Sequence, residues 1–198
     1  SENSDPKQMP TPNEKLAEAR TALQELQKAG RRVFRTSEFS RTHRERLTRN
    51  AFVQEVIKGW LISSSPTARD GDSTPWYASF WEFCARYCDD RFGDQWHLSP
   101  EQSLLLHAEN TIIPPQAVVY SPKGARNKTK LLFDTSIYDV VQQMPPRADL
   151  MVRHGLRLFT PEAALVKVTE AFFQQHPIEA QVVLSSIRDP SGILRRVL

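Results

Sequence analysis

The stretch from Arg31 to Ser63 constrains the fold more than any other part of the chain. It holds two short runs rich in β-branched and aromatic residues, 52–57 and 60–63, on either side of Lys58-Gly59. Because glycine is favoured where a tight turn needs a positive φ, these runs predict a two-stranded hairpin. A third short run, 32–35, predicts another strand before it.

Helices are predicted before and within this stretch. Residues 37–40 form a first small helix, opened by a Thr36/Ser37 cap signal, and residues 42–51 form a second. A short helix, a tight turn, a basic helix and a hairpin follow one another in a winged helix-turn-helix. An earlier helix, 13–29, would complete this unit by packing on Phe39, Leu47 and the sheet. It is predicted to be capped by Asn13 and stopped by Gly30, with one apolar stripe at helical spacing: Leu16, Ala19, Leu23 and Leu26.

The predicted helix 42–51 carries the candidate chemistry. With Leu47 pointing inward and 100° per residue, the inner side also receives His43, the aliphatic stem of Arg44, and Ala51. The outer side receives Arg41, Thr42, Glu45, Arg46 and Arg49. In the major groove, arginine can bind guanine, threonine can contact a thymine methyl group, and glutamate can accept from cytosine. Lys58 and Trp60 of the hairpin would lie near the DNA backbone or minor groove. The candidate DNA-binding residues are therefore Arg35, Ser37, Arg41, Thr42, Arg44, Arg46, Arg49, Lys58 and Trp60.

A different interpretation of the same helix remains open. Arg41, Glu45 and Arg49 are spaced four residues apart, which is also the pattern of a solvated row of ion pairs. Winged helices also serve as protein-contact modules. The pattern alone therefore leaves both a DNA-binding and a protein-binding unit.

The distribution of charge favours the DNA-binding interpretation. The 198 residues carry a formal net charge of only +3. Residues 1–65 hold 12 basic against 8 acidic residues, whereas residues 66–198 hold 14 against 15. Between Lys28 and Arg49 there are eight basic residues and only two acidic ones, Glu38 and Glu45. A local positive field of this kind attracts phosphate.

Composition along the chain predicts four segments. Residues 1–12 are polar and proline-rich and are expected to be a disordered tail. Residues 13–64 form the winged-helix domain, and 65–75 form a linker of turn-forming residues. Residues 76–198 form a mixed α/β domain, so the fold class is α+β.

The second domain is predicted from caps and apolar runs. Thr74 caps a helix to about Phe92 that has apolar residues on two sides and is therefore buried. A Ser99 cap opens a helix that ends near Asn110. Strands are predicted at 117–120 and 131–133, around a basic loop at 122–130, which could be a second phosphate contact but is better explained as an exposed hairpin loop. A hairpin is predicted at 150–153 and 156–159, and helices at 161–173, at 178–188 and after Asp189-Pro190. This last helix stops abruptly at Leu198, which suggests that the natural chain continues.

No catalytic or metal-binding constellation is found among these residues. Cys84 and Cys88 lie on one helical face, form a poor disulfide pair, and do not combine with a histidine at zinc spacing. Asp89, Asp90 and Asp94 cluster at a helix end and are expected to meet solvent. We expect no cofactor and no metal. The lack of a cysteine framework and of an apolar run of about 18 residues favours a cytoplasmic protein with no membrane partner.

Four runs of the sequence resemble a known family: 34–66, 72–110, 155–166 and 179–189. They are similar to the N-terminal region of a group of bacterial Fic-family proteins. That region in turn resembles the AbiEi-like antitoxins of type IV toxin–antitoxin systems. The similarity spans about residues 13–198. It implies a winged helix followed by an antitoxin-like domain, with promoter DNA contacted by Thr42, Arg46, Arg49 and the Lys58-Gly59 wing.

The resemblance also limits the expected activity. In the Fic relatives a following domain transfers AMP to protein hydroxyls through a His-Pro-Phe-x-x-Gly-Asn-Gly-Arg motif, which this sequence lacks. The chain itself is therefore not expected to be an enzyme, although a longer parent protein could be an AMP-transferase. The expected function is a DNA-binding transcriptional regulator of antitoxin type, whose partners are double-stranded DNA and a toxin or Fic catalytic domain. The alternative is a non-catalytic interaction module preceding a Fic domain. A homodimer would suit a palindromic site; Trp76–Trp81 is one candidate surface, although burial within the monomer explains it better.

Overall fold

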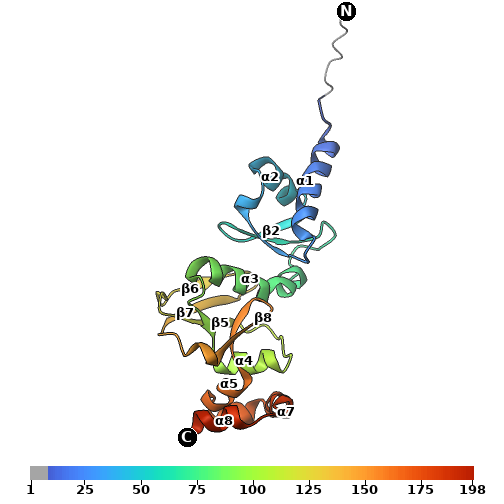
Figure 1. Cartoon of the computed structure of the whole chain (residues 1–198). Coiled ribbons are helices and arrows are strands. Elements are labelled where there is room, and N and C mark those ends of the chain that lie inside the picture. Colours follow the sequence, from blue (N-terminus) through green and yellow to red (C-terminus); the bar gives the residue numbers. More distant parts are fainter. Residues whose placement is uncertain (1–8) are drawn as a thin grey trace, which may run out of the picture. The chain divides into compact units, whose positions relative to one another are not determined.

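The computed structural model describes residues 9–198 as a mixed α+β protein with several small sheets (Figure 1). The chain divides into two compact units, Ser1–Ser79 and Phe80–Leu198, called here the N-terminal and the C-terminal unit. The predicted disordered tail, 1–12, lies largely outside the described residues. Its last residues are ordered, because Thr11 caps helix α1 and Pro12 begins it.

The N-terminal unit is a three-stranded antiparallel sheet with helices. β3 lies between β1 and β2, and β2 and β3 join through the predicted turn at Lys58-Gly59, where Gly59 has a φ of +93°. The hairpin and the third strand are thus confirmed. The elements are α1 (Pro12–Gln27), β1 (Val33–Arg35), the 3₁₀ helix η1 (Thr36–Glu38), α2 (Arg41–Arg49), β2 (Val53–Ile57) and β3 (Trp60–Ser63).

Helix α1 begins earlier than the sequence suggested. The Thr11 hydroxyl accepts from the Glu14 N–H, and the Glu14 carboxylate accepts from the Thr11 N–H, which makes a capping box. Asn13 is therefore inside the helix and is not its cap. The helix ends at Gln27, and Gly30 follows with a φ of +76°.

The core of this unit is built as predicted from the helical stripe of α1. One cluster joins α1, α2, the sheet and Phe39, the residue that follows η1. Its buried members are Ala19, Leu23, Phe34, Phe39, Leu47, Val53 and Leu61. The predicted second helix is shorter than expected, because α2 ends at Arg49. Ala51 has a φ of +58°, lies outside the helix and is exposed, so its predicted inward position was wrong. The first small helix is likewise shifted to Thr36–Glu38.

Helix α3 (Thr74–Phe92) runs across the division between the two units. The Ser73 carbonyl accepts from the Tyr77 N–H and the Asp72 carboxylate accepts from the Thr74 N–H, so Thr74 lies inside the helix rather than capping it. The predicted burial holds for most of its aromatic residues, although Tyr77 is exposed. Gly93 ends the helix with a φ of +63°.

The C-terminal unit contains a four-stranded sheet in the order β4-β5-β7-β6. β5 and β7 are parallel, and the other neighbours are antiparallel. The prediction of a strand at 131–133 was wrong, because Phe133 and Asp134 both adopt positive φ and form a turn. The basic loop, 122–130, also ends in a strand. The strands are β4 (His97–Leu98), β5 (Gln116–Ser121), β6 (Lys128–Lys130) and β7 (Ser136–Val141).

A separate hairpin consists of β8 (Leu150–Arg153) and β9 (Leu156–Phe159), with the residue ranges that the sequence predicted. Its turn, His154-Gly155, has φ of +50° and +78°, the mirror-image geometry that suits a two-residue hairpin. The 3₁₀ helix η2 (Arg147–Asp149) precedes it.

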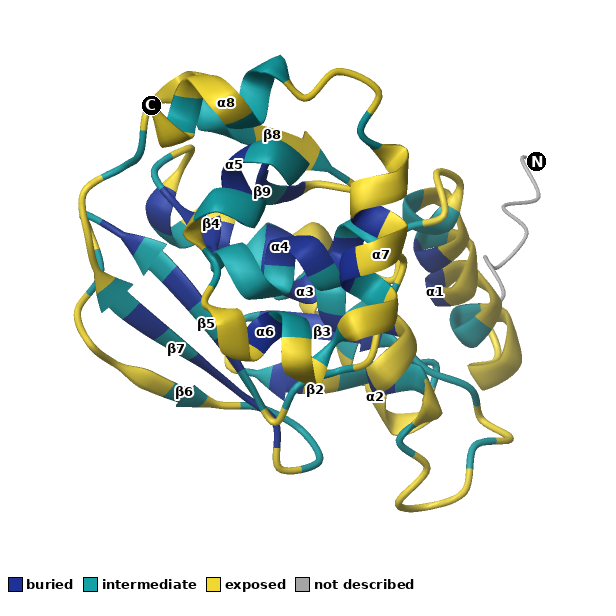
Figure 2. Cartoon of the chain, turned by 90° about the horizontal axis from the view of Figure 1, so that it is seen from below, coloured by how far each residue is buried: buried dark blue, intermediate teal, exposed yellow. Residues whose placement is uncertain are grey.

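Short helices complete this unit, and the four between residues 100 and 186 share one apolar core (Figure 2). Ser99 caps the first of them as expected, and Thr160 caps the second; each hydroxyl accepts from the backbone N–H three residues later. The predicted helix 161–173 is broken at Val168, whose ψ of 154° is extended. The helices are α4 (Pro100–His107), α5 (Pro161–Lys167), α6 (Glu170–Gln175), α7 (Pro177–Ser186) and α8 (Ser191–Val197). Within residues 9–198, no helix has the length and apolar character needed to cross a bilayer.

Candidate nucleic-acid interface

Helix α2 is fixed at its start and on its inner face. The Ser40 hydroxyl accepts from the His43 N–H, and the Ser40 carbonyl accepts from the Arg44 N–H. Leu47, with 0% of its surface exposed, anchors the helix in the core. The opposite face is therefore left to solvent, and Arg41, Thr42 and Arg49 are exposed on it.

Four basic side chains of α2 and the hairpin form no ion pair within the described part of the chain. They are Arg44, Arg46, Arg49 and Lys58. Arg49 and Lys58 are exposed, and Arg44 and Arg46 are partly buried. Because none of the four is held in an ion pair within the described chain, their donors remain available to an anionic ligand.

A surface hollow of about 340 Å³ lies beside α2. Arg44, Thr48 and Arg49 line it from the helix, and Glu55 and Leu61 line it from the sheet. Glu55 and Thr48 were not among the predicted site residues. The alternation of side chains along β2 could have indicated an exposed Glu55, but its proximity to α2 depends on the packing of helix against sheet.

Arg41 and Glu45 form the ion pair that the alternative interpretation anticipated. Their side chains meet at 2.9 Å and are 85% and 52% exposed. The hydrogen bond from Arg41 and its charge, together with the charges of Arg44 and Arg49, lower the pKa of Glu45. The row stops there, because Arg49 forms no ion pair with Glu45 or with any other described residue. One pair in such a solvated position contributes little to stability.

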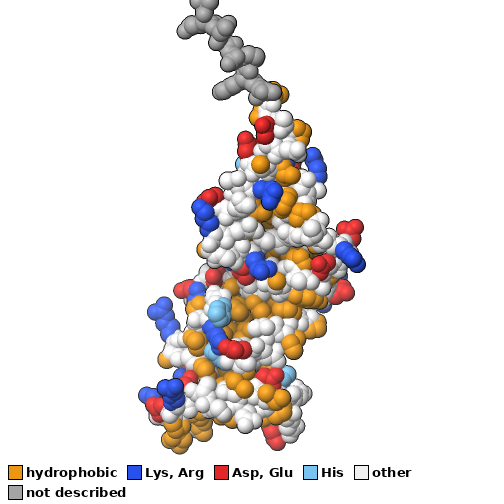
Figure 3. Space-filling model, turned by 90° about the vertical axis from the view of Figure 1, so that its right-hand side faces the viewer, with side chains coloured by type: hydrophobic (Ala, Val, Ile, Leu, Met, Phe, Trp, Pro, Cys, Tyr) orange, Lys and Arg blue, Asp and Glu red, His pale blue; other side chains and the backbone are white. Residues whose placement is uncertain are grey.

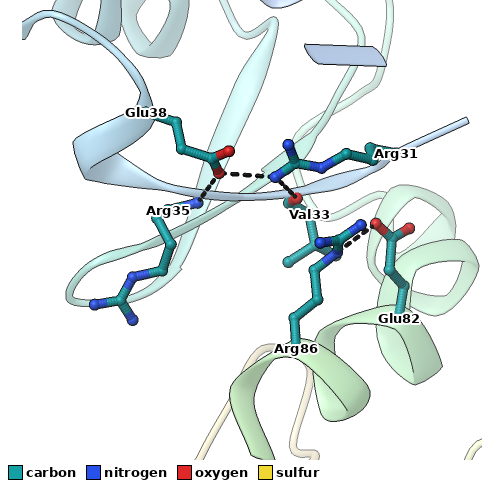
Figure 4. Close-up of polar contacts among 6 residues, drawn as sticks. All are labelled: Arg31, Val33, Arg35, Glu38, Glu82 and Arg86. Atoms are coloured by element: carbon teal, nitrogen blue, oxygen red, sulfur yellow. Dashed lines mark hydrogen bonds and ion pairs between the residues drawn. The ribbon is translucent and has the colours of Figure 1, made fainter. Parts of the chain in front are cut away.

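Two arginines near the hairpin are engaged within the N-terminal unit. The guanidinium of Arg35 lies 4.5 Å from the centre of the Trp60 ring. Glu38 accepts at 2.8 Å both from the side chain of Arg31 and from the Arg35 N–H (Figure 4). Trp60 is only 4% exposed, so its indole is not available for the DNA contact that the sequence suggested.

The predicted site residues therefore fall into separate groups. Arg41, Thr42, Arg44, Arg46 and Arg49 share helix α2, and Lys58 is exposed at the hairpin turn. Ser37 is exposed on η1, outside this helix. Arg35 and Trp60 support the hairpin from β1 and β3.

In the C-terminal unit, the cysteine thiols are buried, and several charged side chains are engaged in ion pairs or hydrogen bonds. Cys84 and Cys88 are free and buried, and burial raises the pKa of both thiols, which keeps them protonated. Glu82 and Arg86 pair along α3 at 3.0 Å (Figure 4). Asp89 accepts from the Trp96 indole N–H at 2.9 Å. Across residues 9–198, no group of three or more histidine, cysteine, aspartate or glutamate side chains is arranged to hold a metal ion.

No protein-family model and no curated protein matches the chain.

Proposed function

We propose that the N-terminal unit binds double-stranded DNA and that the chain acts as a transcriptional regulator of antitoxin type. The observation that carries this proposal is the set of unpaired cations on α2 and the hairpin turn. Other arginines of the unit, such as Arg31 and Arg35, make contacts within it. Arg44, Arg46, Arg49 and Lys58 make no such ion pairs in the described chain.

The order of elements supports a winged helix-turn-helix as the binding fold. α1, η1 and α2 precede a hairpin, and α2 presents its N-terminal residues Arg41 and Thr42 to solvent. In this fold the second helix of the motif enters the major groove with its N-terminal residues at base edges. The hairpin then serves as the wing, where Lys58 would contact the phosphate backbone. The resemblance to AbiEi-like antitoxins implies DNA contact by Thr42, Arg46, Arg49 and the Lys58-Gly59 wing.

Fluorescence anisotropy tests this proposal directly. The chain is titrated onto a labelled duplex from upstream of its own gene and onto a scrambled duplex, each at two salt concentrations. We expect tighter binding to its own duplex and a steep loss of affinity with salt, because phosphate contacts release counterions. Equal binding to both duplexes would limit the function to phosphate attraction. No binding to either would overturn the proposal.

A second candidate function is a non-catalytic interaction module that precedes a Fic catalytic domain or restrains a toxin. Its support is a set of exposed apolar side chains on the last two helices. The space-filling view in Figure 3 shows hydrophobic side chains, in orange, exposed on the side of the molecule that faces the viewer. On α7 and α8 the exposed apolar side chains are Ile178, Val182, Leu184, Leu194 and Val197. A protein partner that covered these side chains would remove apolar surface from water.

A further inference from the structure

Strand β8 is a free edge within the C-terminal unit. It pairs with β9 on one side, and this two-stranded sheet has no other member in the described chain. In a hairpin with a two-residue turn, the residues that flank the turn exchange hydrogen bonds, here Arg153 and Leu156. The N–H and C=O of Val152 therefore face away from β9. Val152 is 56% exposed, and its neighbour Met151 is 37% exposed.

A surface hollow lies on each face of this edge strand. The register places Arg153, Leu156 and Leu158 on one face, where they line a hollow of about 230 Å³ with Leu106, called here the Arg153 hollow. Leu150, Val152 and Arg157 lie on the other face. They line a hollow of about 440 Å³, called here the Arg147 hollow, whose other lining residues include Asp94, Met144, Arg147 and the neighbouring Met151. Side chains that alternate along an added strand would enter the two hollows in turn.

Two arginines, Arg147 and Arg157, and one carboxylate, Asp94, line the Arg147 hollow, so its lining carries an excess of positive charge. Arg147 is exposed and forms no ion pair in the described chain. Arg157 meets Asp89 only at 3.6 Å, and its Nε is buried without a hydrogen-bond partner. Arg153 meets a largely exposed Glu109, also at 3.6 Å. Arg147 therefore retains exposed donors for an incoming acidic group, and Arg157 adds its positive charge to the same hollow.

We propose that β8 binds an extended acidic peptide of another protein by strand addition. Backbone hydrogen bonds to Val152 would hold the peptide, and its acidic side chains would enter the Arg147 hollow. Its alternate, apolar side chains would enter the Arg153 hollow, over Leu156 and Leu158. This division of labour is general for peptides added to a sheet edge: the backbone supplies affinity and the pockets supply specificity.

A second copy of this chain fits the edge less well. Symmetric pairing of β8 with itself would bring Arg147, Arg153 and Arg157 of one copy close to the same three residues of the other. Like charges across an interface oppose association. The inference does not depend on DNA binding, because all its residues lie in the C-terminal unit.

The probe is a short labelled peptide in which glutamate alternates with valine, titrated onto the full chain by fluorescence anisotropy. We expect saturable binding. A matched peptide with lysine in place of glutamate tests the charge requirement, and one methylated on alternate backbone nitrogens tests the hydrogen bonds. We expect both to lose binding. Absence of binding by the glutamate peptide, or equal binding by either matched peptide, would overturn the proposal.

Two variants test the site independently. Val152→Pro removes the outward N–H, at an edge position where proline is tolerated, and should abolish binding. Arg147→Glu leaves the strand unchanged and should weaken binding roughly two- to tenfold. Arg188→Glu, an exposed charge reversal on the same unit, is the control and should bind as the wild type does. Unchanged binding by Arg147→Glu would place the peptide elsewhere, even if Val152→Pro failed to fold. Self-association that Val152→Pro abolishes would instead identify a second copy as the occupant, and would also overturn the proposal.

Discussion

The guanidinium of Arg35 lies 4.5 Å from the centre of the Trp60 ring, and the two residues face each other across β1 and β3. A cation over an indole face is attracted by the negative charge of the ring. Because Trp60 opens β3 directly after the Lys58-Gly59 turn, this contact stabilises the base of the hairpin. It makes Arg35 and Trp60 supports of the proposed interface, whereas Lys58 is the exposed residue that the hairpin presents.

Truncation of Arg35 or Trp60 should therefore lower the stability of the fold, because neither side chain is assigned a direct contact with DNA. We expect Trp60→Ala to lower the free energy of unfolding by about 3–5 kcal/mol, because it leaves a cavity in a packed core. Arg35→Gln should cost about 0.5–1 kcal/mol. Urea denaturation followed by circular dichroism measures both. Lys58→Ala is the control and should leave stability unchanged while it weakens DNA binding. A stable Trp60→Ala variant would contradict the assigned role of the indole.

Removal of single unpaired arginines should weaken DNA binding without unfolding the protein. Arg46→Ala or Arg49→Ala should lose about 1–3 kcal/mol of binding free energy if the residue contacts a guanine. If it contacts a phosphate, the salt slope should fall by about one. Anisotropy on the two duplexes at several salt concentrations separates these outcomes. Arg188→Ala carries the same charge change in the other unit and should bind normally. Wild-type affinity in both helix variants would exclude α2 as the DNA-contacting helix.

Glu45 should oppose DNA binding through its charge. It pairs with Arg41 and lies close enough to Arg44 and Arg49 for their charges to lower its pKa. Glu45→Gln removes a negative charge that neutralises these arginines, so affinity for the scrambled duplex should rise roughly two- to fivefold. If Glu45 also accepts from a cytosine, affinity for the chain's own duplex should fall in the same experiment. No change on either duplex would show that the face containing Glu45 lies away from the DNA.

The stability of the C-terminal unit should decrease in mild acid. Burial lowers the pKa of His97, although its hydrogen bond to the Leu98 carbonyl opposes the shift. Since a carbonyl only accepts, Nδ1 carries the proton, and the buried Nε2 has no partner for a second one. Burial also lowers the pKa of His107. As pH falls below about 6.5, the unfolded chain binds protons that the folded unit excludes, so stability falls with pH.

Thermal unfolding between neutral and mildly acidic pH measures this effect. His97→Phe keeps an aromatic ring against Tyr120 and Phe159 but cannot titrate, so it should show a smaller loss of melting temperature on acidification. The exposed His154 provides the control: His154→Gln should retain the wild-type pH dependence. An identical dependence in His97→Phe and the wild type would show that other groups cause the acid sensitivity.

The parts of the fold that depend on local signals could be predicted from the sequence. The β8–β9 hairpin was predicted with its correct residues because His154-Gly155 suits the positive φ that its turn requires. Strand β7 was missed because Asp139 interrupts its apolar run. That carboxylate is buried and pairs at 2.9 Å with Arg91, a residue of α3 far away in the sequence. No local pattern indicates such a partner.

The candidate site, like the fold, could be predicted where it depends on local periodicity but not where it depends on packing between elements. Helical periodicity around Leu47 correctly placed Arg41, Thr42 and Arg49 on the exposed face. The burial of Trp60 was not foreseen because β3 is the central strand of its sheet, with Trp60, Leu61 and Ile62 all buried. A strand covered on both faces loses the alternation from which exposure is inferred.

The two-residue turn at His154-Gly155 limits how this hairpin can vary between related sequences. Side chains along a strand alternate between faces, so one inserted residue that shifts the pairing of β8 with β9 turns a whole strand over. Leu156 and Leu158 would then exchange faces with Arg157 and Phe159. The turn can therefore tolerate changes of composition that keep positive φ, whereas a change in its length would require both hollows and the core beneath them to be rebuilt together.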